Sequence, residues 1–330
     1  LPKYGLDEWA PDGSYIESPT YWGYATERLF SLVMVLDSAA GDDYGIITAP
    51  GLETTCYFAL HIMDSDSYVW NYHDGGNSTL ENGWWLPSMG TGLFHFAGYF
   101  FNDPTFHEIR EMFLERHGDY GLYDIFYCPI DVDEIDSGYE LPLDYYMEGI
   151  DAFVSRESWN EGAMYTGLMG GYNEASHGNI DSGNFIYRKH GISWFMDLGS
   201  ENYECYGMFG GQRHRYYRTN AEGQNVIITE SLQGGIIYGQ YEIGSGKIIE
   251  TFSNEHGAYA ILDNASAYNT TVSNAKRGIY ITNDRQTVVI QDEITPVKAE
   301  TYWWVAQTGQ KVEIDDTGKV AYITSLRYDD

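Results

Sequence analysis

The first third of the chain has the hydrophobic spacing of helices. Residues 18–41 begin with Ser-Pro, carry apolar residues three or four positions apart, and end at Gly41, which is the pattern of one helix with both of its boundaries. Comparable patterns, with proline near the start and glycine or aspartate at a boundary, predict further helices over 48–64, 86–101 and 103–118. We therefore expect paired helices with short connections in this part of the chain.

Beyond about residue 147 the pattern changes to that of β-strands. Short alternating or β-branched runs follow one another, and turn residues separate them, as in an antiparallel sandwich. The predicted strand segments are 149–156, 183–199, 224–230, 234–243, 246–253, 257–265, 277–294, 300–309 and 319–328. Between the two halves, residues 129–146 contain two prolines and six acidic residues without periodicity, which predicts a linker.

Charge and cysteine content exclude several classes of protein. The chain has 18 Lys and Arg against 49 Asp and Glu, a formal net charge of -31, which disfavours nucleic acid as a partner. Its three cysteines lie far apart, without metal-ribbon spacing. No apolar run approaches the roughly 20 residues of a membrane span. No leader pattern follows Leu1, so we expect that a targeting segment was removed or that the chain begins inside a longer protein.

Motifs for nucleotide binding, zinc proteases and serine hydrolases are missing, and three polar stretches remain as candidates for chemistry. The first surrounds the start of the first predicted helix, where Tyr15, Glu17, Tyr21 and Tyr24 gather. Tyr24 fits core packing, whereas Tyr21 lies in the first turn, where a side chain often faces a cleft.

The second stretch is 175–185, "ASHGNIDSGNF", just before a predicted strand. His177, Asn179 and Asp181 stand at alternate positions, so in an extended chain they would share one face. The glycines between them would let a ligand approach the backbone. We interpret this stretch as a candidate site with a proton-transferring histidine.

The third stretch contains Asp197, at the end of a buried-looking strand, and a basic loop after it. A buried carboxylate needs a partner, which would be a metal, an arginine or a histidine. The loop suits an anionic ligand, with a solvated loop that balances local acids as the alternative. Its candidate residues are Arg213, His214, Arg215, Tyr217 and Arg218.

Taken in order, these stretches resemble the motifs of the heparinase II/III-like polysaccharide lyases. The matching residues are Asp12-Gly13-Ser14 with Glu17 and Tyr21, Arg156-Glu157-Ser158-Trp159, the stretch 177–185, Asp197-Leu198-Gly199, and Gln224-Asn225. The resemblance implies an α+β multidomain protein. It would have a partial α/α toroid over 1–128, the linker over 129–146 and an antiparallel β-sandwich over 147–330.

The resemblance also implies a function. Such lyases cleave uronic-acid polysaccharides by β-elimination, with a tyrosine and a histidine moving the protons; here these would be Tyr21 and His177. The substrate-binding residues would be Glu17, Arg156, Arg213, His214, Arg215, Tyr217 and Arg218. The residue that neutralises the substrate carboxylate would lie before Leu1. We expect a secreted or periplasmic bacterial protein with an acidic polysaccharide as its partner. The negative net charge favours plain polyuronates such as alginate or glucuronan over heavily sulfated chains.

We expect no required cofactor. In related lyases a histidine at position 179, a carboxylate at 197 and a histidine at 224 resemble the ligands of a structural zinc. Here the residues are Asn179, Asp197 and Gln224, and two amides with one carboxylate make a poor zinc site. We expect these side chains either to hydrogen-bond to one another or to hold a harder ion weakly.

Two other functions fit the same pattern. A glycoside hydrolase or phosphorylase of toroid-plus-sandwich type would need two carboxylates about 5–10 Å apart in its cleft. Asp181, Glu17, Glu174 and Glu201 are available for this role. A carbohydrate-binding protein that keeps the fold without the chemistry is the third interpretation.

Overall fold

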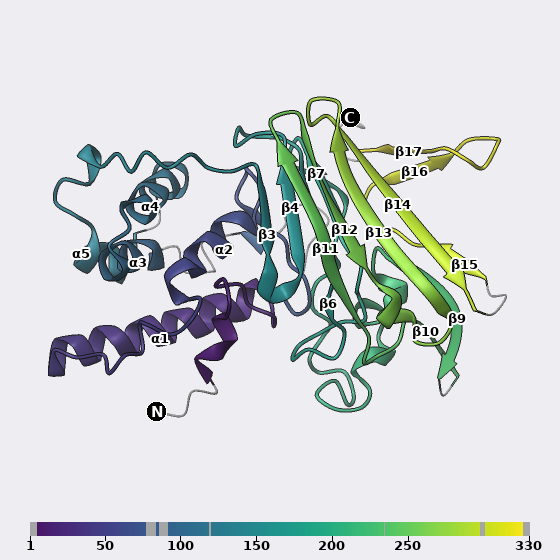
Figure 1. Cartoon of the computed structure of the whole chain (residues 1–330), viewed down its shortest axis with the longest axis horizontal. Helices are drawn as coiled ribbons and strands as arrows, with labels where there is room; N and C mark the ends of the chain where they lie inside the picture. The colour runs from purple at the N-terminus through teal and green to yellow at the C-terminus, as the bar shows by residue number, and fades with distance from the viewer. Residues whose placement is uncertain are drawn as a thin grey trace.

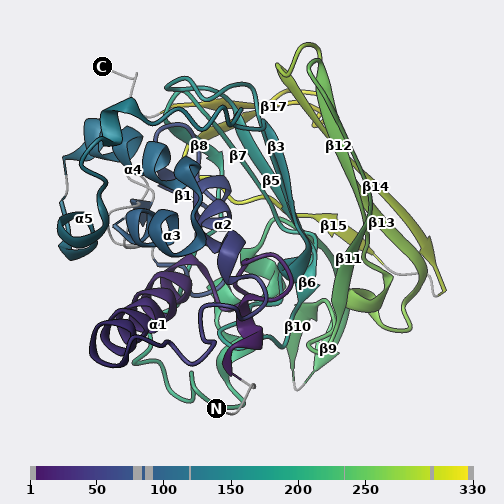
Figure 2. The ribbon, with the colours of Figure 1, turned by 60° about the vertical axis from the view of Figure 1, so that its left-hand side comes forward.

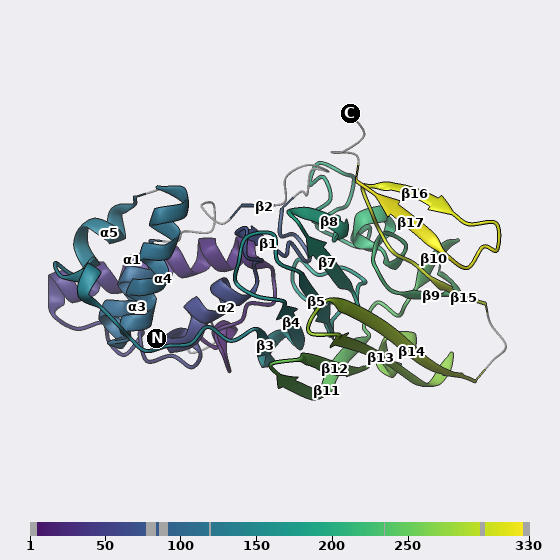
Figure 3. The same cartoon turned by 90° about the horizontal axis from the view of Figure 1, so that it is seen from above.

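The computed structural model describes residues 5–76, 84–85, 92–118, 120–233, 235–297 and 301–325. The helices gather in one lobe and the sheets in another, side by side along the long axis of the molecule (Figures 1 and 3). The helices are α1 (Pro19–Ala40), α2 (Thr55–His61), α3 (Leu93–Phe101), α4 (Pro104–His117) and α5 (Leu122–Tyr127). The 3-10 helices are η2 (Asp7–Trp9), η3 (Leu52–Thr54), η5 (Val132–Glu134), η6 (Glu148–Ile150), η7 (Arg213–Arg215), η8 (Tyr217–Thr219), η9 (Ala221–Gly223) and η10 (Ala265–Tyr268).

Helix α1 has the boundaries that the sequence predicts. The Ser18 hydroxyl accepts a hydrogen bond from the backbone N–H of Tyr21, and Pro19 occupies the first helical position, so the N-terminus is capped. Gly41 ends the helix in the left-handed region with φ 66°. The predicted helix 103–118 is confirmed as α4. Of the predicted segment 86–101, residues 86–91 lie outside the described residues, and α3 occupies the rest.

The described strands form two five-stranded antiparallel sheets and three smaller ones. The first large sheet has the order β3 (Asp144–Met147), β4 (Ala152–Arg156), β5 (Tyr165–Met169), β7 (Phe185–Lys189), β8 (Ile192–Phe195). The second has the order β14 (Thr287–Pro296), β13 (Val272–Thr282), β12 (Gly257–Asp263), β11 (Ser245–Asn254), β6 (Gly171–Tyr172). The smaller sheets are β10 (Ile236–Gly239) with β9 (Ile227–Gln233) and β15 (Tyr302–Trp304), β16 (Lys311–Ile314) with β17 (Ala321–Thr324), and β1 (Tyr68–Val69) with β2 (Trp84–Trp85).

The two large sheets pack face to face (Figure 2). Phe153 and Leu168 of the first sheet belong to one buried cluster with Leu262 and Ile279 of the second. Along β13, buried positions alternate with more exposed ones, as expected for a strand with one face in the core. The predicted antiparallel sandwich is therefore confirmed in its described part.

Two expectations about the first half need adjustment. The sheet begins at Asp144, inside the predicted linker 129–146, where Asp144 pairs with Ser155 of β4 and its carboxylate binds the guanidinium of Arg285 at 2.6 Å. Among the described helices, α3 contacts each of the other four, so the helices gather around α3 and do not close a ring. The α/α toroid stays a prediction. In the part of the chain described, no helix has the length and apolarity to cross a membrane.

A shared core joins the helical lobe to the first sheet. The ring of Trp70 lies so close to Gly167 of β5 that a Cβ there would come within 2.4 Å of it. Phe58 of α2 and Val154 of β4 belong to the same buried cluster. This packing brings the start of α1 next to the loops between β6 and β10, below the sheets in Figure 1.

Candidate active site

Tyr21 and His177, far apart in the sequence, are in direct contact. Their rings stack with centroids 4.0 Å apart and an interplanar angle of 24°. Tyr21 is held in the first turn of α1, and His177 lies in the loop between β6 and β7. The contact therefore spans the boundary between the helical lobe and the sandwich.

Asp74 and Tyr203 link the two rings through hydrogen bonds. The His177 Nδ1 lies 2.7 Å from Asp74 Oδ2, and the Tyr203 hydroxyl donates to the same oxygen at 2.8 Å. The Tyr21 and Tyr203 hydroxyls are 2.8 Å apart. Because the proton of Tyr203 goes to Asp74, Tyr21 donates to Tyr203, and a continuous chain of hydrogen bonds runs from Tyr21 to Asp74. Asp74 and Tyr203 were not identified from the sequence.

Arg213 keeps Asp74 ionised. Its Nη1 and Nη2 donate to the two Asp74 oxygens at 3.0 and 2.9 Å. Burial raises the pKa of Asp74, but the hydrogen bonds from His177 and Arg213 outweigh it and leave this pKa below its ordinary value. Since a carboxylate only accepts, the His177 Nδ1 carries a proton in the neutral ring, which leaves Nε2 as the acceptor. No described residue makes a hydrogen bond to this Nε2.

The loop that carries His177 is a turn, so the expectation of an extended strand end is wrong. His177 has φ 57°, a left-handed conformation that costs free energy and is often found at functional sites. The Gly178 N–H donates to the Ala175 carbonyl at 2.8 Å, and a Cβ on Gly178 would come within 2.7 Å of that oxygen. The side chains of Asn179 and Asp181 consequently point into the protein, where both residues are buried.

A second histidine–aspartate pair lies beneath the first. His73 donates from Nδ1 to the Ile16 carbonyl at 2.9 Å, and its Nε2 is 3.4 Å from Asp181 Oδ1. Burial lowers the pKa of His73, but the charge of Asp181 outweighs it and raises this pKa above its ordinary value. Both ring nitrogens of His73 are thus engaged inside the protein, by the Ile16 carbonyl and the Asp181 carboxylate.

Known structures share this fold. The heparan sulfate lyase HepC from Pedobacter heparinus matches with a TM-score of 0.66 at 13% identity, over 96% of this chain and 44% of that one. The heparinase III BT4657 gene product matches with a TM-score of 0.68 at 16% identity, over 96% and 45%. The fold is heparinase-like. No family model and no curated protein sequence matches the chain, which spans less than half the length of these two structures.

Asn179, Asp197 and Gln224, the three positions that the sequence resemblance associates with a zinc, do not fit that metal. The Asn184 amide donates to Asp197 Oδ2 at 2.7 Å and to Gln224 Oε1 at 3.1 Å, so it engages oxygens that a metal would need. Asn179 Oδ1 accepts instead from Arg213 at 3.2 Å. Burial, and then the charge of Asp181, raise the pKa of Asp197 to about 7. We therefore assign no zinc and no metal-dependent step here.

Most of the basic loop supports the site from inside. Arg213 holds Asp74, His214 is buried and donates to Glu242 at 2.9 Å, and Arg218 donates to the Leu198 carbonyl. The assignment of Arg213 and His214 as substrate-binding residues is corrected, because their donors are already engaged within the protein; for Arg218 that assignment stays a prediction. Arg215 and Tyr217 are exposed. Glu17 is half-buried, directly before the α1 cap.

Arg156 is wrong as a substrate-binding residue. Its side chain is fully buried, with the guanidinium carbon 3.6 Å from the ring centre of Trp159 and Nη2 donating to the His61 carbonyl at 3.2 Å. A stacked arginine inside the core cannot reach a polysaccharide. The Arg-x-x-Trp spacing reflects this stacking.

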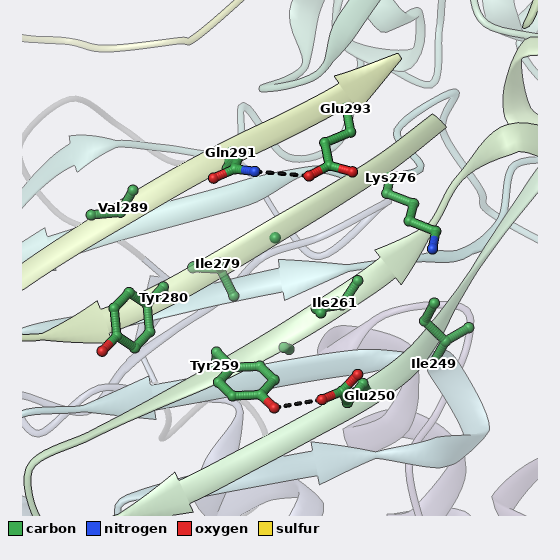
Figure 4. A pocket seen from close by; sticks show the side chains of 12 residues that line it. Ile249, Glu250, Tyr259, Ile261, Lys276, Ile279, Tyr280, Val289, Gln291 and Glu293 are labelled. Carbon is green, nitrogen blue, oxygen red and sulfur yellow. Dashed lines mark hydrogen bonds between the residues drawn. The ribbon is translucent and has the colours of Figure 1, made fainter. Parts of the chain in front are cut away.

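A shallow hollow of about 450 Å³ lies on the outer face of β11 to β14 (Figure 4). Tyr259 donates to Glu250, and Gln291 donates to Glu293 at 2.9 Å. The two carboxylates would repel an acidic sugar. This hollow contains none of the candidate active-site residues described above.

Proposed function

We propose that the chain acts as a polysaccharide lyase that cleaves a uronic-acid polysaccharide by β-elimination. The observation that supports it is the stacked contact of Tyr21 and His177, joined through Tyr203 and Asp74. Such an elimination needs one group that takes the proton beside the substrate carboxylate and another that protonates the departing glycosidic oxygen. The heparinase-like fold supports the same reaction class.

The hydrogen bonds suggest how the two roles divide. Asp74 fixes the tautomer of His177, so Nε2 has the lone pair needed to take the proton from the sugar carbon. The carbon–oxygen bond to the next sugar then breaks and a carbon–carbon double bond forms. Tyr21 gives its hydroxyl proton to the departing oxygen.

Tyr203 remains a neutral hydroxyl during this cycle. Burial, with the hydrogen bonds to Tyr21 and Asp74, raises the pKa of Tyr203 well above its ordinary range. Tyr203 therefore positions the Tyr21 hydroxyl, and Tyr21 regains its proton from solvent after His177 releases the one it took. The exposed Arg215 and Tyr217 and the half-buried Glu17 are the residues we propose for contact with the sugar chain.

The test is ultraviolet absorbance over time with alginate, glucuronan, hyaluronan, chondroitin and heparan sulfate. Elimination leaves a double bond conjugated to the carboxylate, which absorbs, whereas hydrolysis does not. We expect a rise on at least one substrate, and a loss of about 10²- to 10⁴-fold in Tyr21→Phe and His177→Ala.

Two exposed residues of the same types serve as matched controls. Tyr24→Phe changes an exposed tyrosine one turn further along α1, and His190→Ala changes an exposed histidine that also has positive φ. Both should keep the wild-type rate. New reducing ends without absorbance would show a hydrolase, and binding to a substrate without any product would show a binding protein; an undiminished rate in Tyr21→Phe would overturn the assigned role.

A further inference from the structure

Three helices of the N-terminal lobe bring a histidine, a glutamate and a cysteine together, away from the candidate active site. His95 lies on α3, Glu111 on α4, and Cys128 caps the C-terminus of α5. One donor atom from each lies within 4.8 Å of the other two. We infer that these residues bind a divalent transition-metal ion of the zinc class.

The donor types favour such an ion. Imidazole and thiolate are the ligands that zinc prefers, whereas calcium and magnesium take oxygen ligands. The thiolate of Cys128 and the carboxylate of Glu111 would together balance the charge of a dication. Binding forms a metal–sulfur bond, breaks the S–H bond and releases that proton to solvent.

The donor atoms are close enough to one another to be three ligands of one ion. His95 Nε2 is already 3.1 Å from Glu111 Oε1, and zinc ligands at their usual bond lengths stand about 3.3–3.8 Å apart. Asp124 lies further away, with Oδ1 3.9 Å from His95 Nε2. Arg110 holds Asp124 by two hydrogen bonds of 2.8 and 2.7 Å, so a water molecule is the natural fourth ligand.

His107 is placed to accept the hydrogen bond that a metal-binding histidine usually donates from its other ring nitrogen. Its Nδ1 lies 2.9 Å from His95 Nδ1, and His95 is fully buried. With the metal on Nε2, the His95 proton sits on Nδ1 and is donated to His107, which fixes the ring. Ring contacts of Phe94 with Phe106 and Phe113 hold α3 against α4, so two of the three ligands are pre-positioned.

The experiment is a titration of the purified chain with Co²⁺, which gives a near-ultraviolet charge-transfer band only when a thiolate binds it. We expect the band in the wild type and in the control Cys205→Ser, competition by Zn²⁺, and loss of the band in Cys128→Ser. His107→Phe should weaken binding by about 10- to 100-fold.

Circular dichroism checks the folding of each variant. If Cys128→Ser does not fold, Glu111→Gln is tested in its place. Glu111→Gln should also lower the affinity for Co²⁺. A folded wild type without a band at excess Co²⁺ overturns the inference. A band that persists in Cys128→Ser, or is lost in Cys205→Ser, overturns it as well. None of these readouts depends on lyase activity.

Discussion

The two histidine–aspartate pairs of the site use the same chemistry in opposite ways. His73 and Asp74 are neighbours in the sequence, yet Asp74 pairs with His177 and His73 pairs with Asp181. In the outer pair the His177 side chain is 21% exposed, whereas both members of the inner pair are 2% exposed. We call these the outer pair and the inner pair.

A carboxylate has a different role beside the imidazole in the partly exposed pair and in the buried pair. In the outer pair Asp74 occupies one ring nitrogen of His177 and leaves the other for a substrate. In the inner pair both ring nitrogens of His73 are engaged, by Ile16 and Asp181, so no nitrogen remains for a substrate. The outer pair is suited to chemistry, and the inner pair fastens the start of α1 to the sandwich.

The largest effect should come from Asp74→Asn in the outer pair. An amide presents a donor or a weaker acceptor to His177, so the favoured tautomer and the ion pair with Arg213 are both lost. We expect a fall of about 10³-fold in kcat, within the range of lost acid–base catalysis. Steady-state kinetics by ultraviolet absorbance, with circular dichroism as the check on folding, measures it. Activity within tenfold of wild type would mean that Asp74 does not orient His177.

The next largest effect should be on stability, from Asp181→Asn in the inner pair. This change removes the carboxylate that raises the pKa of the buried His73, and breaking a buried ion pair from one side typically costs about 3–5 kcal/mol of unfolding free energy. Denaturant unfolding measures it. The control is Asp284→Asn, since His256 and Asp284 form a pair in which both side chains are exposed, 71% and 83%; its removal should change little. Equal effects in the two variants would show that burial does not distinguish the pairs.

The third effect, the smallest within any single pH unit, should be a pH dependence that originates beside the inner pair. Since the pKa of Asp197 is raised to about 7, the folded state keeps a proton that the unfolded state releases above about 3.9. The stabilisation is complete below the unfolded pKa and is lost as pH rises to about 7, with a slope of at most about 1.4 kcal/mol per pH unit.

Thermal or denaturant unfolding between pH 4 and 7 tests this slope. Asp74, whose pKa is lowered, acts in the opposite sense and below this window, where its stabilisation is lost as pH falls. Asp197→Asn should flatten the slope between about pH 4 and 7. An unchanged slope in that variant would assign the titration to another group.

The fold was predictable wherever the local sequence carries its own boundary signals. Ser18, Pro19 and Gly41 define both ends of α1, and the alternating pattern of 257–265 predicts β12. Strand β5 was missed because Tyr165–Met169 is buried on both faces and has no alternation to detect. The start of β3 was missed because its contacts include residues distant in the sequence, such as Arg285, which binds Asp144.

The site was predictable only in part, because some of its contacts join residues that are distant in the sequence. Tyr21 and His177 stand within recognisable motifs. Asp74 lies 103 residues from its partner His177, and no local pattern indicates that pairing. The sequence shows that Arg213 carries a charge, but whether the charge faces a ligand or Asp74 depends on tertiary packing.

The adjacent residues His73 and Asp74 also have a consequence for how the molecule folds. Contacts between residues so distant in the chain form late, because a long loop must be closed before they bring any stabilisation. Helices such as α1 and hairpins such as β13–β14 depend on local contacts and can form earlier. His73 and Asp74 both contact the loop between β6 and β7, where their partners Asp181 and His177 lie. The candidate active site is therefore assembled in the same step that docks the two lobes, and a half-folded chain has no functioning version of it.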